Sequence, residues 1–278
     1  RRSRWASKRE RWRLWKEQHD FTALRVDDPL VAGRQGIAED FLQRKVSDPA
    51  LRAALTPDYP FRCKRVLLGS DYYAALQRDN TDLVTEPIVE ITESAVVAGS
   101  RVTDVDAVVL ATGFQTNHYL AGIEVIGADG QSLHERWGED PSAYLGVAVS
   151  GFPNFFMLYG PNTNQGGNSI VYILEAGARL VADAVARLAR TGGSLQVRPE
   201  AERRFNDEIG AELEHTVWTR CGSYFRSPSG RIVTQWPYKE LEYARRTWRL
   251  RSRDWTHDDY RPDGQVPMTA SDSRRSSS

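Results

Sequence analysis

The sequence is poor in cysteine and carries no net charge. Its 278 residues include two cysteines, Cys63 and Cys221, which lie far apart and form no CxxC pair. Such sparse cysteine favours reduced thiols and a cytoplasmic location over a disulfide framework or a redox pair. Lys and Arg together number 37, and so do Asp and Glu. This balance gives no electrostatic sign of a nucleic-acid partner.

Long apolar runs and metal-ligand patterns are also missing. The most apolar stretch, residues 169–189, is interrupted by Glu175, Arg179, Asp183 and Arg187. It is therefore too polar to serve as the roughly 18–20 residues of a membrane span. The five histidines show no ligand spacing, so we expect no metal site. With 40% hydrophobic residues, the chain has enough apolar material for a globular core.

Two further absences concern the beginning of the chain. It starts at Arg1, and its only methionines are Met157 and Met268. It also lacks any GxGxxG loop, the pattern that sets a dinucleotide pyrophosphate on a helix N-terminus. We therefore interpret the chain as the C-terminal part of a longer protein.

The periodicity of apolar residues predicts helices first. Residues 1–18 are strongly basic and place three tryptophans on one side of a helix. We expect this helix to dock its tryptophans on the rest of the domain, a membrane-surface or polyanion-binding helix being the alternative. A second helical stretch, residues 37–55, is split at Asp48 and Pro49, because proline suits a first helical turn.

Short strands should follow the helices. The candidates are residues 64–68, 81–86, 87–92, 106–112, 144–149 and 155–159, with a hairpin turn over 98–104. A glycine-rich loop and a long helix come next, and the expected apolar face of this helix comprises Ile170, Ile173, Leu174, Val181, Ala184, Val185 and Leu188. The order strand, glycine-rich loop, helix is typical of an α/β cradle for an anion or a cofactor. The serine-rich tail, residues 264–278, is expected to be disordered.

Two turns are candidate ligand contacts. Ala111, Thr112 and Gly113 follow a predicted buried strand over 107–110, and their small side chains let the backbone approach a bulky planar ligand. An ordinary strand-to-loop turn is the alternative. The loop before the long helix would stabilise negative charge at the helix N-terminus, plain N-capping being the alternative. The candidates there are Gly160, Pro161, Asn162, Asn168 and Ser169.

These segments together resemble class B flavoprotein monooxygenases, the group of the Baeyer–Villiger and flavin-containing monooxygenases. The matching blocks are FRCKRVLLGSDYYAAL from Phe61, DAVVLATGF from Asp106 and YLGVAVSGFPNFFMLYGPNTNQGGNS from Tyr144. The block CGSYFRSPSGRIVTQWPYKELEYARRT is similar to the branch that includes 4-hydroxyacetophenone monooxygenase. The resemblance extends over residues 51–253. It implies an α/β fold, the C-terminal portion of a flavoprotein with two Rossmann-like dinucleotide-binding domains.

The resemblance also implies cofactors and roles. FAD and NADPH are the expected cofactors, and O2 and a small-molecule ketone the expected substrates. Arg65 is the expected catalytic residue, a permanent cation that stabilises negative charge formed after oxygen adds to the flavin. Lys64 is expected to bind the NADPH 2′-phosphate, facing away from Arg65 on an extended strand. A pair of surface charges is the alternative. The Ala111–Gly113 turn and the loop from Gly160 to Ser169 then become FAD contacts.

The same resemblance predicts domain boundaries. Residues 1–60 would be a mostly helical part of the NADPH-domain region, 61–112 the rest of that domain, and 113–263 the C-terminal part of the FAD domain. Other functions stay open: oxygenation of a nitrogen or sulfur atom, or a truncated, non-catalytic paralogue. The missing CxxC argues against a disulfide reductase. Because both glycine loops are absent, this chain alone is not expected to be active.

Two aromatic sets have structural explanations beside functional ones. Asp71, Tyr72 and Tyr73 would either support the site from behind or form a helix N-cap with packed tyrosines. Trp137, Trp218 and Trp236 are expected in the core, a place at the border of a substrate pocket being the alternative.

Overall fold

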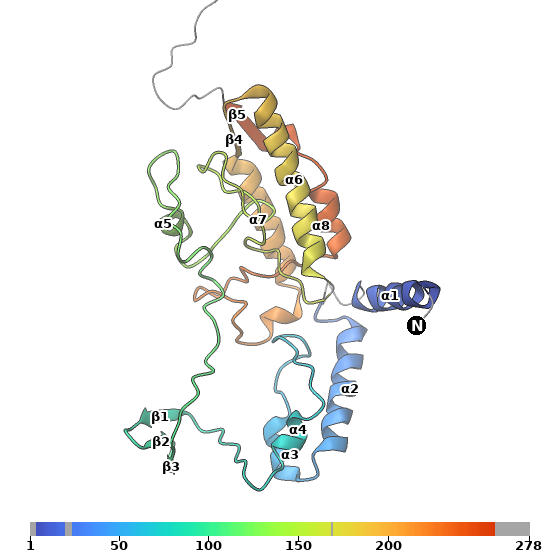
Figure 1. The fold of residues 1–278 in the computed structure, drawn as a ribbon, viewed down its shortest axis with the longest axis vertical. Helices are drawn as coiled ribbons and strands as arrows, with labels where there is room; N and C mark the ends of the chain where they lie inside the picture. Colours follow the sequence, from blue (N-terminus) through green and yellow to red (C-terminus); the bar gives the residue numbers. More distant parts are fainter. Residues whose placement is uncertain (1–3, 20–23, 168, 259–278) are drawn as a thin grey trace, which may run out of the picture.

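The structure is a computed structural model that describes residues 4–19, 24–167 and 169–258. Helices α6, α7 and α8 with strands β4 and β5 form its upper part, and helices α2–α4 with strands β1–β3 form its lower part (Figure 1). The helices are α1 Arg4–His19, α2 Pro29–Lys45, α3 Pro49–Leu55, α4 Tyr72–Ala75, α5 Leu133–Trp137, α6 Ile170–Thr191, α7 Pro199–Leu213 and α8 Glu240–Arg246. The described residues also include two 3-10 turns, η1 Val217–Thr219 and η2 Ser252–Asp254.

Within the described ranges, the strands form two small antiparallel sheets. The first has the order β1–β2–β3, with strands Ile88–Ile91, Ala95–Ala98 and Arg101–Asp104. It confirms the predicted strand over 87–92 and the predicted hairpin, whose turn uses a positive φ of 56° at Gly99. The second sheet pairs β4, Ser194–Val197, with β5, Trp255–Asp258. The sequence does not predict this second sheet, because its two strands lie far apart in the chain.

The N-terminal helices confirm the predicted split at proline. The Asp48 carboxylate accepts a hydrogen bond from the Ala50 amide at 2.9 Å, and Pro49 occupies the first turn of α3. Helix α2 begins in the same way, with Asp28 capping at 2.9 Å ahead of a proline. It therefore begins at Pro29, before the expected residue 37.

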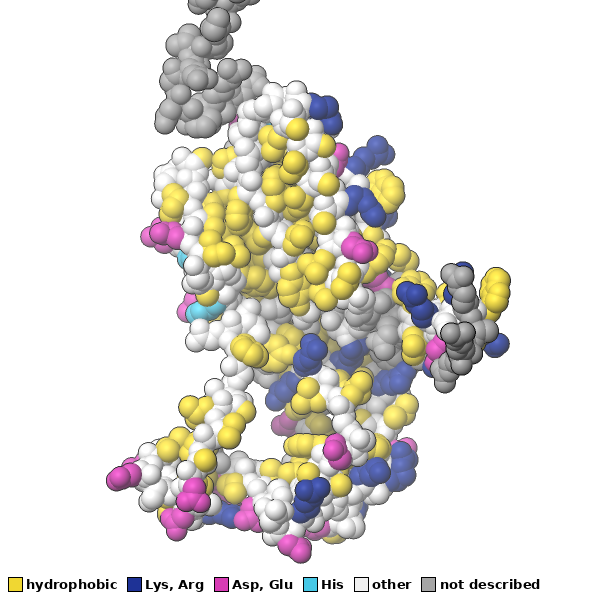
Figure 2. Space-filling model, viewed as in Figure 1, with side chains coloured by type: hydrophobic (Ala, Val, Ile, Leu, Met, Phe, Trp, Pro, Cys, Tyr) yellow, Lys and Arg dark blue, Asp and Glu magenta, His cyan; other side chains and the backbone are white. Residues whose placement is uncertain are grey.

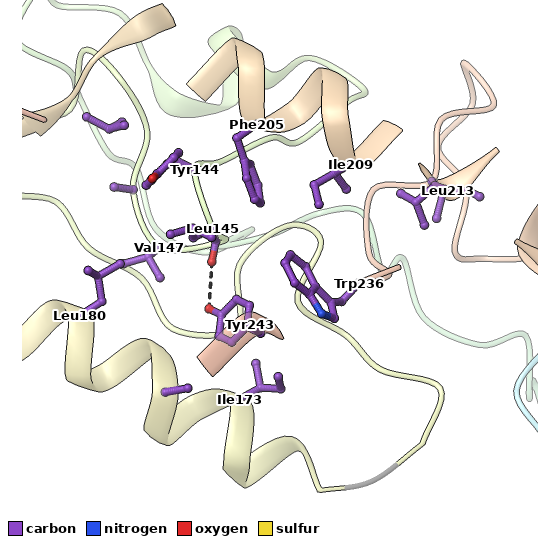
Figure 3. Close-up of a cluster of buried hydrophobic side chains, with 14 of the residues drawn as sticks. Tyr144, Leu145, Val147, Ile173, Leu180, Phe205, Ile209, Leu213, Trp236 and Tyr243 are labelled. Carbon is purple, nitrogen blue, oxygen red and sulfur yellow. Dashed lines mark hydrogen bonds between the residues drawn. The ribbon is translucent and has the colours of Figure 1, made fainter. Parts of the chain in front are cut away.

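The core lies between α6 and α7. Ile173 and Leu180 of α6 and Phe205 of α7 point toward the loop at residues 144–148, as Figure 3 shows. The Tyr243 hydroxyl of α8 donates a hydrogen bond of 2.9 Å to the Leu145 carbonyl within this core. The long helix and most of its apolar face were correctly predicted. Val185 was not, since it is 52% exposed.

Several predicted strands are wrong. Residues 64–68, 81–86, 106–112, 144–149 and 155–159 form no strand among the described residues. The loop 144–148 is a buried turn, closed by an isolated bridge between Tyr144 and Ala148. Val109 and Leu110 are 88% and 73% exposed, so the predicted buried strand over 107–110 is also wrong. An apolar segment forms a strand only where another strand pairs with its backbone, and the described residues offer this one no such neighbour.

The two cysteines form a disulfide, contrary to the expectation of reduced thiols. The Cα atoms of Cys63 and Cys221 lie 6.1 Å apart, although the residues are separated by 158 positions in sequence. Whether two cysteines can pair depends on their distance in the fold, which spacing along the chain does not give. The expectation of a cytoplasmic location rested on unpaired thiols and loses that support.

The chain ends and the tryptophans give mixed outcomes. Helix α1 is confirmed as a helix but projects from the side of the molecule (Figure 1), and its Trp5 and Trp12 are 81% and 62% exposed, so the expected docking is wrong. Trp137, Trp218 and Trp236 are buried, as expected for core residues. The tail over 264–278 lies outside the described residues. Among those that are described, no helix combines the length and apolarity of a membrane span.

Candidate functional site

A cavity of about 350 Å³ lies where the segment after Phe61 meets the loop before α6. This volume is within the range of small-molecule sites, roughly 300–1,000 Å³. A first wall comes from Arg62, Lys64, Arg65 and Val66, and a second wall from Asn164, Gln165, Gly166, Gly167 and Ile170. Tyr159, Trp218, Phe225 and Gln235 complete the lining. Two segments that the sequence singled out separately therefore meet at one site.

The first wall is cationic. Lys64 and Arg65 both line the cavity. Residues 64–68 form no strand, so the expected extended strand is wrong here. The Lys64 ammonium lies 4.4 Å from the centre of the Tyr59 ring. Arg62 is partly buried, and burial, together with the nearby charges of Arg34 and Arg65, lowers its pKa. The first wall thus concentrates positive charge at the cavity. Figure 2 shows Lys and Arg side chains, in dark blue, gathered between the upper and lower parts of the molecule.

The second wall is held in place by buried residues of the preceding loop. The Asn162 side-chain amide donates to the carbonyls of Ile232 and Gln235, each at 3.0 Å. A Cβ on Gly160 would lie 2.5 Å from the Gly146 carbonyl oxygen, so only glycine fits there. Gly160, Pro161 and Asn162 thus anchor the loop from behind, while the next residues reach the cavity. Ser169 is the exposed N-cap of α6, and the predicted contact Asn168 lies outside the described residues.

Tyr159 and Gln235 both contact Asn164 of the second wall. The Tyr159 hydroxyl donates a hydrogen bond of 2.8 Å to the Asn164 side-chain oxygen. Burial raises the pKa of Tyr159, and the positive charge of Arg65 partly offsets this rise. Gln235 is 1% exposed and forms a backbone bridge with Asn164, which fixes it beside the loop.

The site is suited to a ligand that carries negative charge. Three cations line it, its described lining contains no Asp or Glu, and the start of α6 adds the positive end of a 22-residue helix dipole. The lining also holds amide atoms without a partner: both polar atoms of the Gln165 side chain, and Oε1 of Gln235. Buried polar atoms of this kind are normally hydrogen-bonded. A planar ligand with adjacent donors and acceptors, as at the pyrimidine edge of a flavin, fits these residues.

The Ala111–Gly113 turn is not part of this cavity. Ala111, Thr112 and Gly113 are exposed, and none of them is among the residues that line it. Gly113 has the positive φ expected of the turn, 88°, and an added Cβ there would meet nothing within 4 Å. The structure therefore shows the backbone conformation that we predicted, on a surface open for contact.

The Asp71–Tyr73 segment has a structural role. It opens the four-residue helix α4, and the Tyr73 ring packs on Phe41 and on Tyr72 with centroids 5.8 and 5.6 Å away. None of its residues lines the cavity. Lining residues that the sequence did not single out include Arg62, Tyr159 and Gln235, whereas Gln165 lies within the predicted loop from Gly160 to Ser169. Each lies inside a quoted block, but only the folded chain shows which side chains reach the cavity.

Among the described residues, no group of three or more His, Cys, Asp or Glu side chains is placed to hold a metal ion.

Comparison with known proteins places this geometry in context. No family model matches the chain. It is 38% identical over 223 residues to a Baeyer-Villiger monooxygenase of Pseudomonas aeruginosa, an alignment that covers 78% of this chain and 41% of the relative. A Baeyer-Villiger monooxygenase of Streptomyces coelicolor is 38% identical over 219 residues, or 77% of this chain and 42% of the relative. The chain therefore spans about two fifths of the length of the curated relatives it matches.

The chain is also similar in fold to solved monooxygenase structures. A steroid monooxygenase bound to NADP superposes with a TM-score of 0.71 at 29% identity, covering 86% of this chain and 49% of that one. A structure of OTEMO with FAD and NADP gives 0.72 at 27% identity, covering 81% and 43%. In sequence and in fold, the chain corresponds to the C-terminal part of class B flavoprotein monooxygenases of the Baeyer–Villiger group.

Proposed function

We propose that the chain is part of an FAD- and NADPH-dependent monooxygenase that inserts one atom of O2 into a ketone. The observation that carries the proposal is the convergence of Arg65 and the Gln165–Gly167 loop on one cationic cavity at the start of α6. The names of the matched relatives support the same activity. Their greater length means that the activity is proposed for the complete protein.

Different residues of this chain would bind FAD and NADPH. The loop residues Gln165, Gly166 and Gly167 would hold the pyrimidine end of the flavin, where the α6 N-terminus stabilises negative charge. Lys64 would bind the 2′-phosphate of NADPH. The bound flavin, reduced by NADPH, supplies the activation of O2. Ala111, Thr112 and Gly113 would contact FAD from outside this cavity.

Arg65 would be the catalytic residue. A guanidinium keeps its charge at every physiological pH and offers several donors in a fixed plane. Placed at the cavity wall, it would stabilise negative charge that develops on oxygen during insertion, more strongly than any charge on the ketone itself. Its contribution would therefore be specific to the oxygenation step.

The domain boundaries and the location remain part of the proposal. Residues 1–112 would belong to the NADPH-binding side and residues 113–263 to the FAD-binding side. The cytoplasm, which supplies NADPH, would be the site of action.

The test is to express the complete coding sequence and examine the purified protein. We expect a yellow protein that oxidises NADPH in preference to NADH and converts an aryl ketone to an ester, with one oxygen from ¹⁸O2 recovered in the product. A colourless protein that gains no flavin on reconstitution would refute the proposal. Oxidation of a sulfide or an amine with no ester formed would replace the ketone by a nitrogen or sulfur substrate.

A further inference from the structure

The disulfide joins the two sides of the cavity. Arg62, Lys64 and Arg65 surround Cys63 in sequence and line the cavity from one side. Trp218 and Phe225 flank Cys221 and line it from another side. The covalent bond therefore connects the cationic segment to the aromatic part of the same site.

The cationic segment has no regular secondary structure of its own. Within the described ranges, residues 61–70 belong to no helix or strand, and Leu67 and Leu68 are 86% and 97% exposed. The Cys63 amide bonds only three residues back, to the Pro60 carbonyl at 3.0 Å. The packing of Lys64 on Tyr59 is local as well. Phe61, at the start of the segment, also packs on the core cluster that contains Trp218, and its amide donates to the Gln35 side-chain oxygen at 3.4 Å.

The segment that carries Cys221 is anchored in the core. Trp218 of η1 is 1% exposed, and the Val217 amide donates a hydrogen bond of 3.0 Å to the carbonyl of Leu24, a buried residue before α2. The disulfide thus attaches a segment without regular secondary structure to one that is anchored in the core. Repulsion among Arg62, Lys64, Arg65 and the nearby Arg34 favours exposure of the segment to solvent, where water and salt screen these charges.

We propose that Cys63 and Cys221 are positioning residues: their disulfide holds Arg62, Lys64 and Arg65 at the cavity, and anion binding there weakens when a dithiol reduces the bond. The inference rests on the cavity being an anion site and not on the identity of the cofactor. Opening consumes two electrons and two protons from the dithiol, which leaves as a cyclic disulfide.

The order of sulfur exchange follows from exposure. Cys63 is fully buried while Cys221 is partly exposed, so the reductant thiolate bonds to the Cys221 sulfur and the Cys63 sulfur leaves as a thiolate. Arg62 and Lys64, adjacent in sequence, favour that leaving group because they carry positive charge. The second thiol of the reductant then attacks the mixed disulfide and releases Cys221 as a thiol.

Hydrogen exchange on the chain from Arg1 to Ser278 tests the positioning directly. The chain is compared oxidised, reduced with a dithiol, and reoxidised. We expect peptides over residues 61–66 to exchange faster after reduction and to recover after reoxidation, while peptides over the β2–β3 hairpin do not change. Equal exchange over 61–66 in all three states would overturn the proposal. So would two free thiols, found by thiol titration, in protein purified without reductant.

Inorganic pyrophosphate serves as the anionic probe, with binding measured by calorimetry. Losing one charge-assisted contact corresponds to about tenfold in affinity, and we expect at least that much weakening on reduction. The Cys63→Ala/Cys221→Ala variant should bind pyrophosphate like the reduced chain, and adding the dithiol should not change its affinity. This control separates the effect of breaking the disulfide from other effects of the reagent. Arg101→Ala, on β3, is the matched control and should bind like the unmodified chain.

The outcomes distinguish this proposal from the proposed function. Redox-dependent pyrophosphate binding in a protein that never acquires flavin would support the positioning role and refute the monooxygenase. A yellow, active complete protein whose pyrophosphate affinity is the same before and after reduction would support the monooxygenase and refute the positioning role.

Discussion

Removing the Cys63–Cys221 bond should lower the stability of the fold as well as loosen the cavity. The bond joins residues 158 positions apart. Cross-linking a loop of that length restricts the unfolded chain by about 5 kcal/mol at 25 °C in the chain-entropy description, and disulfides typically contribute about 2–4 kcal/mol. We therefore expect the Cys63→Ala/Cys221→Ala variant to lose about 2–5 kcal/mol in the free energy of unfolding.

Urea unfolding followed by tryptophan fluorescence measures this loss. The unfolding midpoint of the variant, and of the reduced chain, should fall below that of the oxidised chain. The denaturant dependence should steepen, because an unfolded chain without the cross-link exposes more surface. Each single variant should lose as much as the double variant, since either change removes the whole bond. Identical midpoints for oxidised and reduced chains would refute the reasoning.

Three further predictions address individual side chains. In the complete protein, Arg65→Ala should leave flavin reduction by NADPH intact but slow ketone oxygenation by about 10²–10³-fold, as separated by stopped-flow absorbance, whereas Arg101→Ala changes neither. Tyr243→Phe should cost about 1–3 kcal/mol in urea unfolding, because a buried backbone carbonyl loses its hydrogen bond; an unchanged midpoint would contradict this. The hydrogen bond from Arg245 lowers the pKa of Glu242 to about 2, so its contribution to stability is present above pH 4.5 and lost as the pH falls toward 2; Glu242→Gln should remove that pH dependence from the unfolding midpoint.

The features that sequence predicted well are those set by neighbouring residues. The start of α3 is one, because Asp48 and Pro49 supply a cap and a fixed φ within two positions. Helix α6 is another, because its apolar residues repeat with the helical period over 22 positions. The β2–β3 hairpin follows from residues that are adjacent in sequence. In each case the information lies within a few residues of the element itself.

The features that sequence missed depend on distant parts of the chain. Asn164 meets Gln235 in a parallel bridge, and Asn162 bonds to carbonyls in the same distant segment. Gln235 thereby reaches the cavity, although no local pattern marks it. The pairing of Cys63 with Cys221 is a second case. Apolar spacing and turn residues carry no information about such contacts, which exist only once the chain has folded.

The exposed Ala111–Gly113 turn is a predicted FAD contact that lies outside the cavity. Under the proposed function, this turn and the Gln165–Gly167 loop contact the same FAD, yet only the loop lines the cavity. The apolar segment before the turn carries Val109 at 88% exposure and has no pairing strand in the described residues. Burying such a segment would stabilise the protein by about 25 cal/mol for each Å² of apolar surface removed from water. The chain spans 41% of the length of its Pseudomonas aeruginosa relative; under the proposed function, this segment would be covered and the turn would contact FAD in the complete protein.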